Sequence, residues 1–99
     1  MAGMTQIEKI DLSHNNIKDI EVLRELTGLE ELNLCDNHIQ DISALENHTN
    51  LKVLYLLKNE ISDITPLQDL TNLRELDVTL NPVSDYSCVE FVPYLNELQ

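Results

Sequence analysis

Asparagine and aspartate recur at a fixed spacing of 22 residues, and among the side chains of this sequence they are the best suited to binding a ligand or a metal. The recurring residues are Asn15, Asn37, Asn59 and Asn81, together with Asp19, Asp41, Asp63 and Asp85. A carboxylate column can hold Ca²⁺, which needs several oxygen ligands at one point. A repeat spreads the carboxylates apart, so we expect the aspartates to cap backbone N–H groups at turns. We expect the asparagine amides to satisfy backbone groups of neighbouring coils rather than to bind a ligand.

The histidines and hydroxyl residues show no catalytic arrangement. His14, His38 and His48 fall at the eighth, tenth and twentieth positions of the repeat, so they form no column and no metal set. His48 interrupts an apolar column made otherwise of Leu26, Leu70 and Val92, and we expect it to be neutral and partly buried. No Ser/His/Asp or Cys/His group shares a face, and no glycine-rich phosphate loop is present. We therefore expect no enzyme activity, no cofactor and no metal site.

A unit of 22 residues must position these columns. It begins at Ile7, Leu29, Leu51, Leu73 and Leu95. The four complete units are residues 7–28, 29–50, 51–72 and 73–94, and Leu95 starts a fifth unit that is not completed. We expect residues 1–99 to form a single domain, with a C-terminal cap at about 82–99.

Self-similarity at this period is typical of a solenoid. The segment LxxLxL at the start of each unit predicts a short strand with inward leucines and outward intervening residues. Aliphatic residues three apart in the second half of the unit, such as Ile17, Ile20, Leu23 and Leu26, predict a 3₁₀ or short α turn. The predicted fold class is an α/β solenoid, a right-handed superhelix with one parallel β-sheet on the concave face and short 3₁₀/α turns on the convex face.

The pattern LxxLxLxxNxI resembles the leucine-rich repeat, in the 22-residue class of the Sds22-type regulatory subunit of protein phosphatase 1, dynein axonemal light chain 1 and bacterial internalins. The resemblance covers residues 7–95, and the longer motif NxIxDIxxLxxLTNLxxL runs intact through residues 59–76. Residues 61–73, ISDITPLQDLTNL, look especially like internalin repeats. The resemblance implies recognition of another protein across the concave face.

The two ends of the chain differ in their resemblance. The tail resembles the C-terminal cap of the intracellular members at Pro82, Val83, Tyr86, Phe91, Val92, Pro93, Leu95 and Leu98. Residues 1–6 do not resemble the N-terminal helical cap of the exported internalins. We therefore expect the first strand, residues 8–12, to be open and to permit self-association.

Charge and cysteine usage limit the partners. Eighteen acidic residues against six basic ones give a net charge of −12, which repels nucleic acid and anionic membranes. Cys35 and Cys88 occupy different positions of the repeat and face different ways, so we expect two free thiols and a reducing, cytoplasmic location. No segment approaches the roughly 18 apolar residues of a transmembrane helix.

The outward strand positions identify a candidate binding surface. Its apolar centre is Val53, Tyr55, Leu57 and Leu80, because the inward places are already filled by Leu54 and Leu56. Its surround is Asp11, Glu31, Asn33, Asp36, Lys58, Glu75 and Asp77. Single apolar residues are common on surfaces, but a contiguous group indicates a binding site.

The predicted function is a non-catalytic protein-binding module whose partner has a basic rim and an apolar centre. One alternative is a regulatory or targeting subunit of a phosphatase or another enzyme complex. The other alternative is a fragment of an internalin-like surface adhesin.

Overall fold

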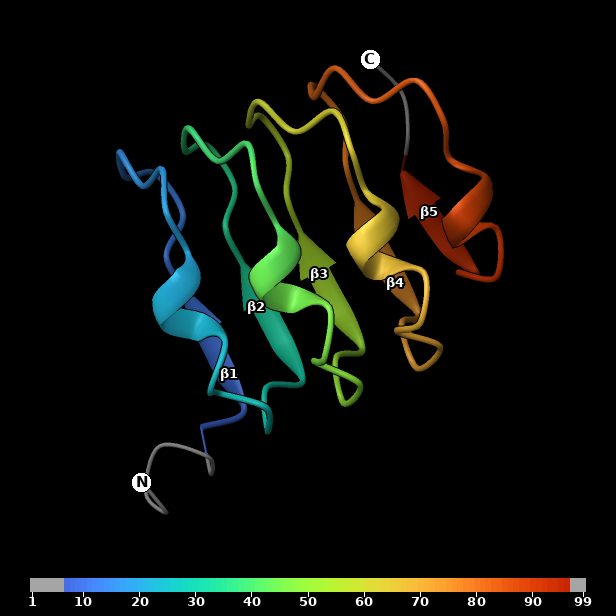
Figure 1. Ribbon diagram of the computed structural model, residues 1–99, viewed down its shortest axis with the longest axis horizontal. Coiled ribbons are helices and arrows are strands. Elements are labelled where there is room, and N and C mark those ends of the chain that lie inside the picture. The colour runs from blue at the N-terminus through green and yellow to red at the C-terminus, as the bar shows by residue number, and fades with distance from the viewer. Residues whose placement is uncertain (1–6, 97–99) are drawn as a thin grey trace.

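The computed structural model describes residues 7–96 of the chain as a stack of similar coils, each with one strand and one 3₁₀ turn (Figure 1). The strands are β1 (Lys9–Asp11), β2 (Glu31–Asn33), β3 (Val53–Tyr55), β4 (Glu75–Asp77) and β5 (Tyr94–Asn96). The turns are η2 (Glu21–Leu23), η3 (Ser43–Leu45), η4 (Thr65–Leu67) and η5 (Ser87–Val89). The strands form one parallel sheet in the order β1-β2-β3-β4-β5, which confirms the predicted solenoid.

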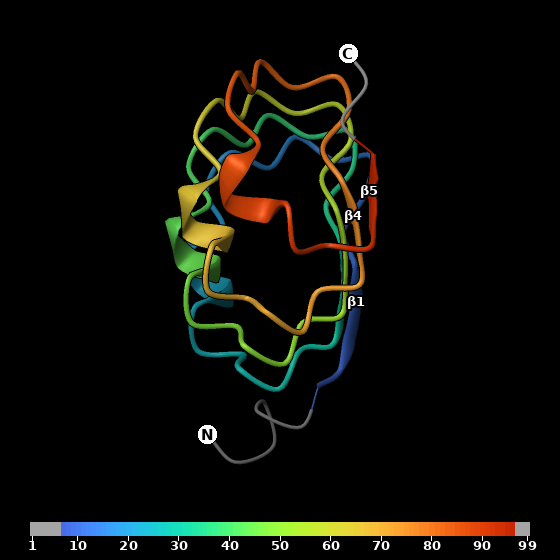
Figure 2. The same ribbon diagram turned by 90° about the vertical axis from the view of Figure 1, so that its right-hand side faces the viewer.

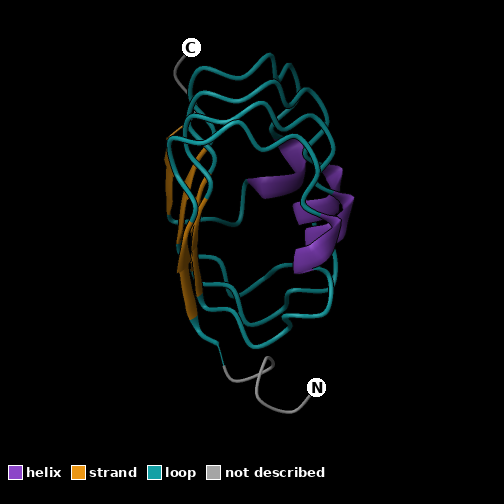
Figure 3. Cartoon of the chain, turned by 90° about the vertical axis from the view of Figure 1, so that its left-hand side faces the viewer, coloured by secondary structure: helices purple, strands orange, loops and turns teal. Residues whose placement is uncertain are grey.

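The sheet and the 3₁₀ turns form opposite sides of the stack (Figures 2 and 3). Strand leucines point inward, and Leu54 and Leu56 are fully buried. Aliphatic residues of the turns meet them from the other side, including Ile42, Leu45, Ile64 and Leu67. Outward side chains of β1 to β5 are left on a surface that we call the strand face.

Buried asparagine amides link successive coils. The Asn59 Nδ2 donates to the carbonyl oxygens of Leu34, in the preceding coil, and Leu56, at 2.9 and 3.0 Å. Its Oδ1 accepts the backbone N–H of Ile39 at 3.1 Å. Asn37 and Asn81 make the equivalent bonds. These three asparagines therefore make the inter-coil bonds expected of a structural ladder.

Asn15 is the exception in this ladder. Its amide donates only within the first coil, to the carbonyl oxygens of Leu12 and Ser13, and its side chain is exposed. The asparagine at the start of the described stack therefore links no earlier coil.

The recurring aspartates cap the 3₁₀ turns, as expected. Each accepts the backbone N–H two residues later at 2.8 to 2.9 Å, from Glu21, Ser43, Thr65 and Ser87. Bonds from Ser43 and Thr65 hold the pKa values of Asp41 and Asp63 below their ordinary range. Within residues 7–96 no three His, Cys, Asp or Glu side chains converge on a point that would hold a metal ion.

The last strand departs from the 22-residue step. β5 pairs with β4 so that Leu95 lies opposite Leu76, 19 residues earlier, and Tyr94 lies opposite Glu75. The prediction that Leu95 starts a fifth unit opposite Leu73 is therefore wrong. The physical reason is a shortened return. Only Pro93 and Tyr94 separate the buried Val92 from Leu95, whereas residues 71–75 separate Leu70 from Leu76.

His48 is fully buried rather than partly buried. Its Nε2 donates to the carbonyl oxygen of Leu23 at 2.8 Å, while its Nδ1 is buried without a hydrogen-bond partner among the described residues. Burial lowers the pKa of His48 because the charged imidazolium would lose its hydration. The prediction of a neutral filler is consistent with this environment.

The first coil is less covered than the others. Ile10, Leu12 and Ile17 are partly exposed, whereas their counterparts in the second coil, Leu32, Leu34 and Ile39, are buried. The predicted open edge concerns β1 and residues 1–6. Those residues and Leu98 lie outside the described range, so the predictions made for them are not tested here.

Cys35 follows β2 on the strand side, and Cys88 lies in η5 with its thiol directed at the Ile64 carbonyl oxygen at 3.4 Å. Both are free thiols, and burial raises the pKa of each. None of the helices in residues 7–96 has the length and hydrophobicity that a membrane crossing requires.

We predict that Asn59→Ala lowers the free energy of unfolding by about 2 to 4 kcal/mol, because it strips buried backbone groups of their partners. Asn15→Ala is the matched control and should cost less than about 1 kcal/mol, since its amide is exposed and bonds only its own coil. Urea unfolding followed by circular dichroism measures both. Equal losses would contradict the proposed role of the ladder.

We predict that His48→Leu stabilises the protein by about 1 kcal/mol at pH 7, because it removes a buried unpaired nitrogen. The Leu23 carbonyl keeps its bond from the Leu26 N–H at 3.0 Å. The pKa of His48 is lowered in the fold and lies near 6.5 in the unfolded chain. The unfolded state therefore binds more protons as the pH falls below about 6.5, and the wild type loses stability there.

The leucine variant should lose less stability over the same pH range. Val22→Ala is the control, because Val22 is 74% exposed and carries no titratable group, and it should leave the loss unchanged. Unfolding midpoints at pH 7.5, 6.5 and 5.5 measure the difference, and parallel curves for wild type and His48→Leu would refute the interpretation.

Candidate protein-binding surface

The sheet register arranges the outward strand residues in two rows across the strand face. One row contains Lys9, Glu31, Val53, Glu75 and Tyr94. The other contains Asp11, Asn33, Tyr55, Asp77 and Asn96. The structure therefore brings together, on one face, seven of the residues expected there, and adds Lys9 and two residues from β5.

An apolar patch of Val53, Tyr55, Leu57 and Leu80 lies across β3 and the end of β4. The first three side chains are partly exposed, and Leu80 is 55% exposed. The backbone N–H of Lys58 donates to the Thr79 carbonyl oxygen at 3.0 Å, which places the segments ending in Leu57 and Leu80 side by side. All four side chains predicted for the apolar centre are therefore at least partly exposed.

Leu80 is the least expected member of this patch. Its φ of 58° lies in the left-handed region, as do the φ angles of His14, Asp36 and Lys58 at the same position of the other repeats. This conformation costs an L-residue roughly 1–2 kcal/mol, and a bulky side chain is uncommon there. Neither burial nor backbone preference accounts for a leucine at this position.

A hydrogen bond fixes the aromatic ring of the apolar patch. The Tyr55 hydroxyl donates to Glu75 Oε2 at 2.6 Å. This bond, with burial and the nearby charges of Glu75, Glu31 and Asp77, raises the pKa of Tyr55 to about 12. The phenol stays protonated at neutral pH, and its ring is held in place beside β4.

The acidic surround is neutralised unevenly. Lys9 pairs with Glu31 at 3.2 Å, and Asp36 has both His14 at 2.9 Å and Lys58 at 3.8 Å nearby. The His14 bond is the main cause that lowers the pKa of Asp36. These are exposed pairs, and each contributes little to stability.

The acids of β4 lack such cations. Asp77 Oδ1 accepts the Thr79 N–H and hydroxyl at 3.0 and 2.7 Å. Within residues 7–96, no lysine or arginine forms an ion pair with Glu75 or Asp77. Asp11 on β1 is in the same situation, since its Oδ1 accepts the Ser13 N–H and hydroxyl at 3.0 and 2.6 Å. Of the strand-face acids without an ion pair among the described residues, two therefore lie on β4 and one on β1.

Sequence reasoning missed Tyr94. It placed this residue at the last position of the fourth unit, but Tyr94 is an outward residue of β5 and is 72% exposed. An open groove of about 510 Å³ is lined by Glu75, Pro93, Tyr94, Leu95 and Asn96. The available signal is the segment Tyr94–Asn96, which repeats the outward, inward, outward order of Val53–Tyr55.

Another open groove lies away from the strand face. It measures about 540 Å³ and is lined by Lys18, His38, Gln40, Asp41 and Glu60. His38 Nδ1 lies 3.0 Å from Glu60 Oε2, and this bond is the main cause that lowers the pKa of Glu60.

Comparisons with known proteins identify the repeat family of this chain. A family model for leucine-rich repeats, in two copies, matches residues 5–47 and 49–90. A search of curated protein sequences returns no significant match.

Several solved structures are similar. An internalin (InlF) from Listeria monocytogenes shares 36% identity at a TM-score of 0.88, with 96% of this chain and 29% of that chain covered. Internalin C2 from the same organism shares 32% identity at a TM-score of 0.83, covering 99% and 43%.

The functional domain of InlJ from Listeria monocytogenes, described as including a cysteine ladder, shares 27% identity at a TM-score of 0.80, covering 92% and 20%. This chain therefore spans less than half the length of each of these structures. Since the family model covers most of residues 1–99 and the described coils show its parallel sheet, this chain belongs to the leucine-rich repeat family.

Proposed function

We propose that this protein is a non-catalytic module that binds another protein through the strand face. The observation that carries the proposal is the apolar patch of Val53, Tyr55, Leu57 and Leu80. Exposed apolar groups of this kind, rimmed by polar residues, mark interaction sites. The ring of Tyr55 adds a rigid aromatic anchor, the residue type that dominates binding energy at interfaces.

The charges of the strand face favour a partner with basic residues around an apolar centre. Glu75 and Asp77 lack basic partners among the described residues, and the whole chain carries a net charge of −12. Opposite charge speeds association and suppresses wrong partners. The same charge repels phosphate backbones and anionic lipid, which supports a protein partner over nucleic acid or membrane.

A second candidate is an internalin-like surface adhesin, supported by the 36% identity to the internalin InlF. The two candidates place the chain in different compartments. The first implies the cytoplasm, in keeping with the two free thiols, and the second implies the cell surface. Protease treatment of intact source cells, followed by immunodetection, separates them: degradation supports the adhesin, and protection supports the cytoplasmic module.

We predict that Tyr55→Ala combined with Leu57→Ala abolishes capture of the partner. Immobilised wild type and variant are exposed to a lysate of the source organism, and retained proteins are identified by mass spectrometry. Val22→Ala is the control, because Val22 is 74% exposed in η2 on the opposite side. A protein retained by the wild type and control but lost from the double variant supports the proposal. Equal recovery on all three would refute it.

We further predict that Leu80→Asn stabilises the protein while it weakens partner capture. Asparagine tolerates the left-handed conformation better than leucine, so the free energy of unfolding should rise by up to about 1 kcal/mol. Loss of an exposed apolar contact should reduce the amount of partner retained. Lys58→Asn, at the same position of the third repeat, is the control for the conformational gain. If Leu80→Asn retains as much partner as the wild type, Leu80 is excluded from the binding surface.

A further inference from the structure

The β4–β5 end of the strand face combines two tyrosines and one carboxylate. Tyr94 lies directly opposite Glu75 in the sheet register, and the Tyr55 hydroxyl reaches Glu75 from the other side. Parallel strands lie about 4.8 Å apart, so β3 and β5 are separated by roughly 10 Å. Tyr55 lies in the row of Asp77 and Asn96, two residues along the strands from the row of Glu75 and Tyr94. Glu75 stands between the two aromatic side chains.

Three observations indicate that this place can accept a further group. Tyr94 is 72% exposed, although burying a tyrosine ring is favourable. The Glu75 carboxylate accepts the Tyr55 hydroxyl but forms no ion pair with a lysine or arginine of residues 7–96. An open groove of about 510 Å³ lies beside both residues. An aromatic face, an unpaired anion and open space therefore meet at one point.

We propose that this site receives an arginine side chain of the partner, with its guanidinium on Glu75 and against the ring of Tyr94. The inference rests on the proposed function and names the chemistry of one contact within it. An ionised carboxylate that has accepted one hydrogen bond still has acceptor positions for the guanidinium N–H groups. The tyrosine face attracts the cation.

Arginine fits this site better than lysine. Its guanidinium is planar, stacks on aromatic faces and is less strongly hydrated than an ammonium group. A flat group suits the space beside one ring and over a carboxylate, and Val53, which lies opposite Glu75 on β3, can contact the apolar stem of the side chain. The adjacent Asp77 adds negative charge without a competing lysine.

The test is a nuclear magnetic resonance titration with Nα-acetyl-arginine methylamide. The matched probe is the citrulline derivative, which has nearly the same shape and no charge. We expect the arginine probe to shift the backbone amides of Glu75, Tyr94 and Asn96 more than it shifts the rest of the chain. The citrulline probe should produce less than a third of that effect.

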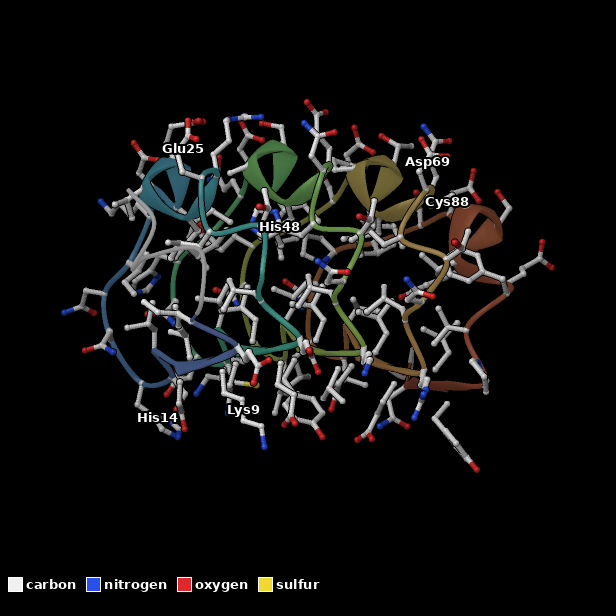
Figure 4. The ribbon with its side chains drawn as sticks, turned by 90° about the horizontal axis from the view of Figure 1, so that it is seen from below. Lys9, His14, Glu25, His48, Asp69 and Cys88 are labelled. Atoms are coloured by element: carbon white, nitrogen blue, oxygen red, sulfur yellow. The ribbon has the colours of Figure 1, made fainter. Side chains whose placement is uncertain are left out.

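Three variants locate the contact. Tyr94→Leu keeps an apolar side chain and should lower the affinity for the arginine probe by about threefold, which is the usual size of an exposed cation–π contact. Glu75→Gln should weaken it further. Asp69→Asn removes one charge on the side of the 3₁₀ turns, where Asp69 and Glu25 lie opposite Lys9 and His14 (Figure 4), and should change nothing. Unchanged amide dispersion in each variant verifies folding.

The inference is overturned if citrulline shifts these amides as much as arginine, if a lysine probe binds more tightly, or if Asp69→Asn weakens binding as much as Glu75→Gln. Its failure is distinguishable from failure of the proposed function. Capture that still depends on Tyr55 and Leu57 would leave the strand face as the binding surface without an arginine contact. If the arginine probe does not bind at Glu75 and Tyr94, and partner capture does not depend on Tyr55 and Leu57, the strand face is excluded as the binding surface.

Discussion

The amide of a buried asparagine is the contact on which the stack depends. A coil that contains only a three-residue strand and a three-residue turn leaves many bends whose backbone groups have no partner in regular secondary structure. Such groups are costly when buried. Asn59 satisfies three of them, in two adjacent coils, with one side chain. Because the same bonds recur at Asn37 and Asn81, successive coils stack in one repeating arrangement and their strands fall into register.

That regularity separates the residues that hold the fold from the residues free to vary. Inward positions such as Leu54 and Leu56 must fill the same space in every coil, so they remain leucine or a close equivalent. Outward positions contact only their neighbours on the strand face. They range from Lys9 through Val53 to Glu75 along a single row. Any specificity of the protein therefore resides in these rows and in the bends that follow them.

The repeating part of the fold could be predicted because each of its residues plays the same role in every coil. The strand at β5 could not, because Leu95 and Leu98 continue the leucine spacing of the 22-residue step and conceal a return shortened by three residues. Tyr94 was lost from the candidate site for this reason. The bond from Tyr55 to Glu75 and the pairing of Lys9 with Glu31 depend on side-chain rotamers, which a linear pattern does not contain. His48 is fully buried although partial burial was expected, because its column is otherwise aliphatic and the core packs around it.

The charges of the strand face are distributed unevenly from β1 to β5. Lys9 offsets Glu31 and Lys58 offsets Asp36, whereas among the described residues β4 keeps two acids without an ion pair and β1 keeps one, Asp11. With 18 acids and six bases, the chain cannot neutralise every carboxylate internally. Interfacial charge contributes more to orientation and association rate than to affinity. A partner whose cations gather at one end would therefore meet this face in a single orientation, with its apolar contacts set against Val53, Tyr55 and Leu57. Under the proposed function, the excess of acidic residues would serve recognition at β4 as well as solubility elsewhere.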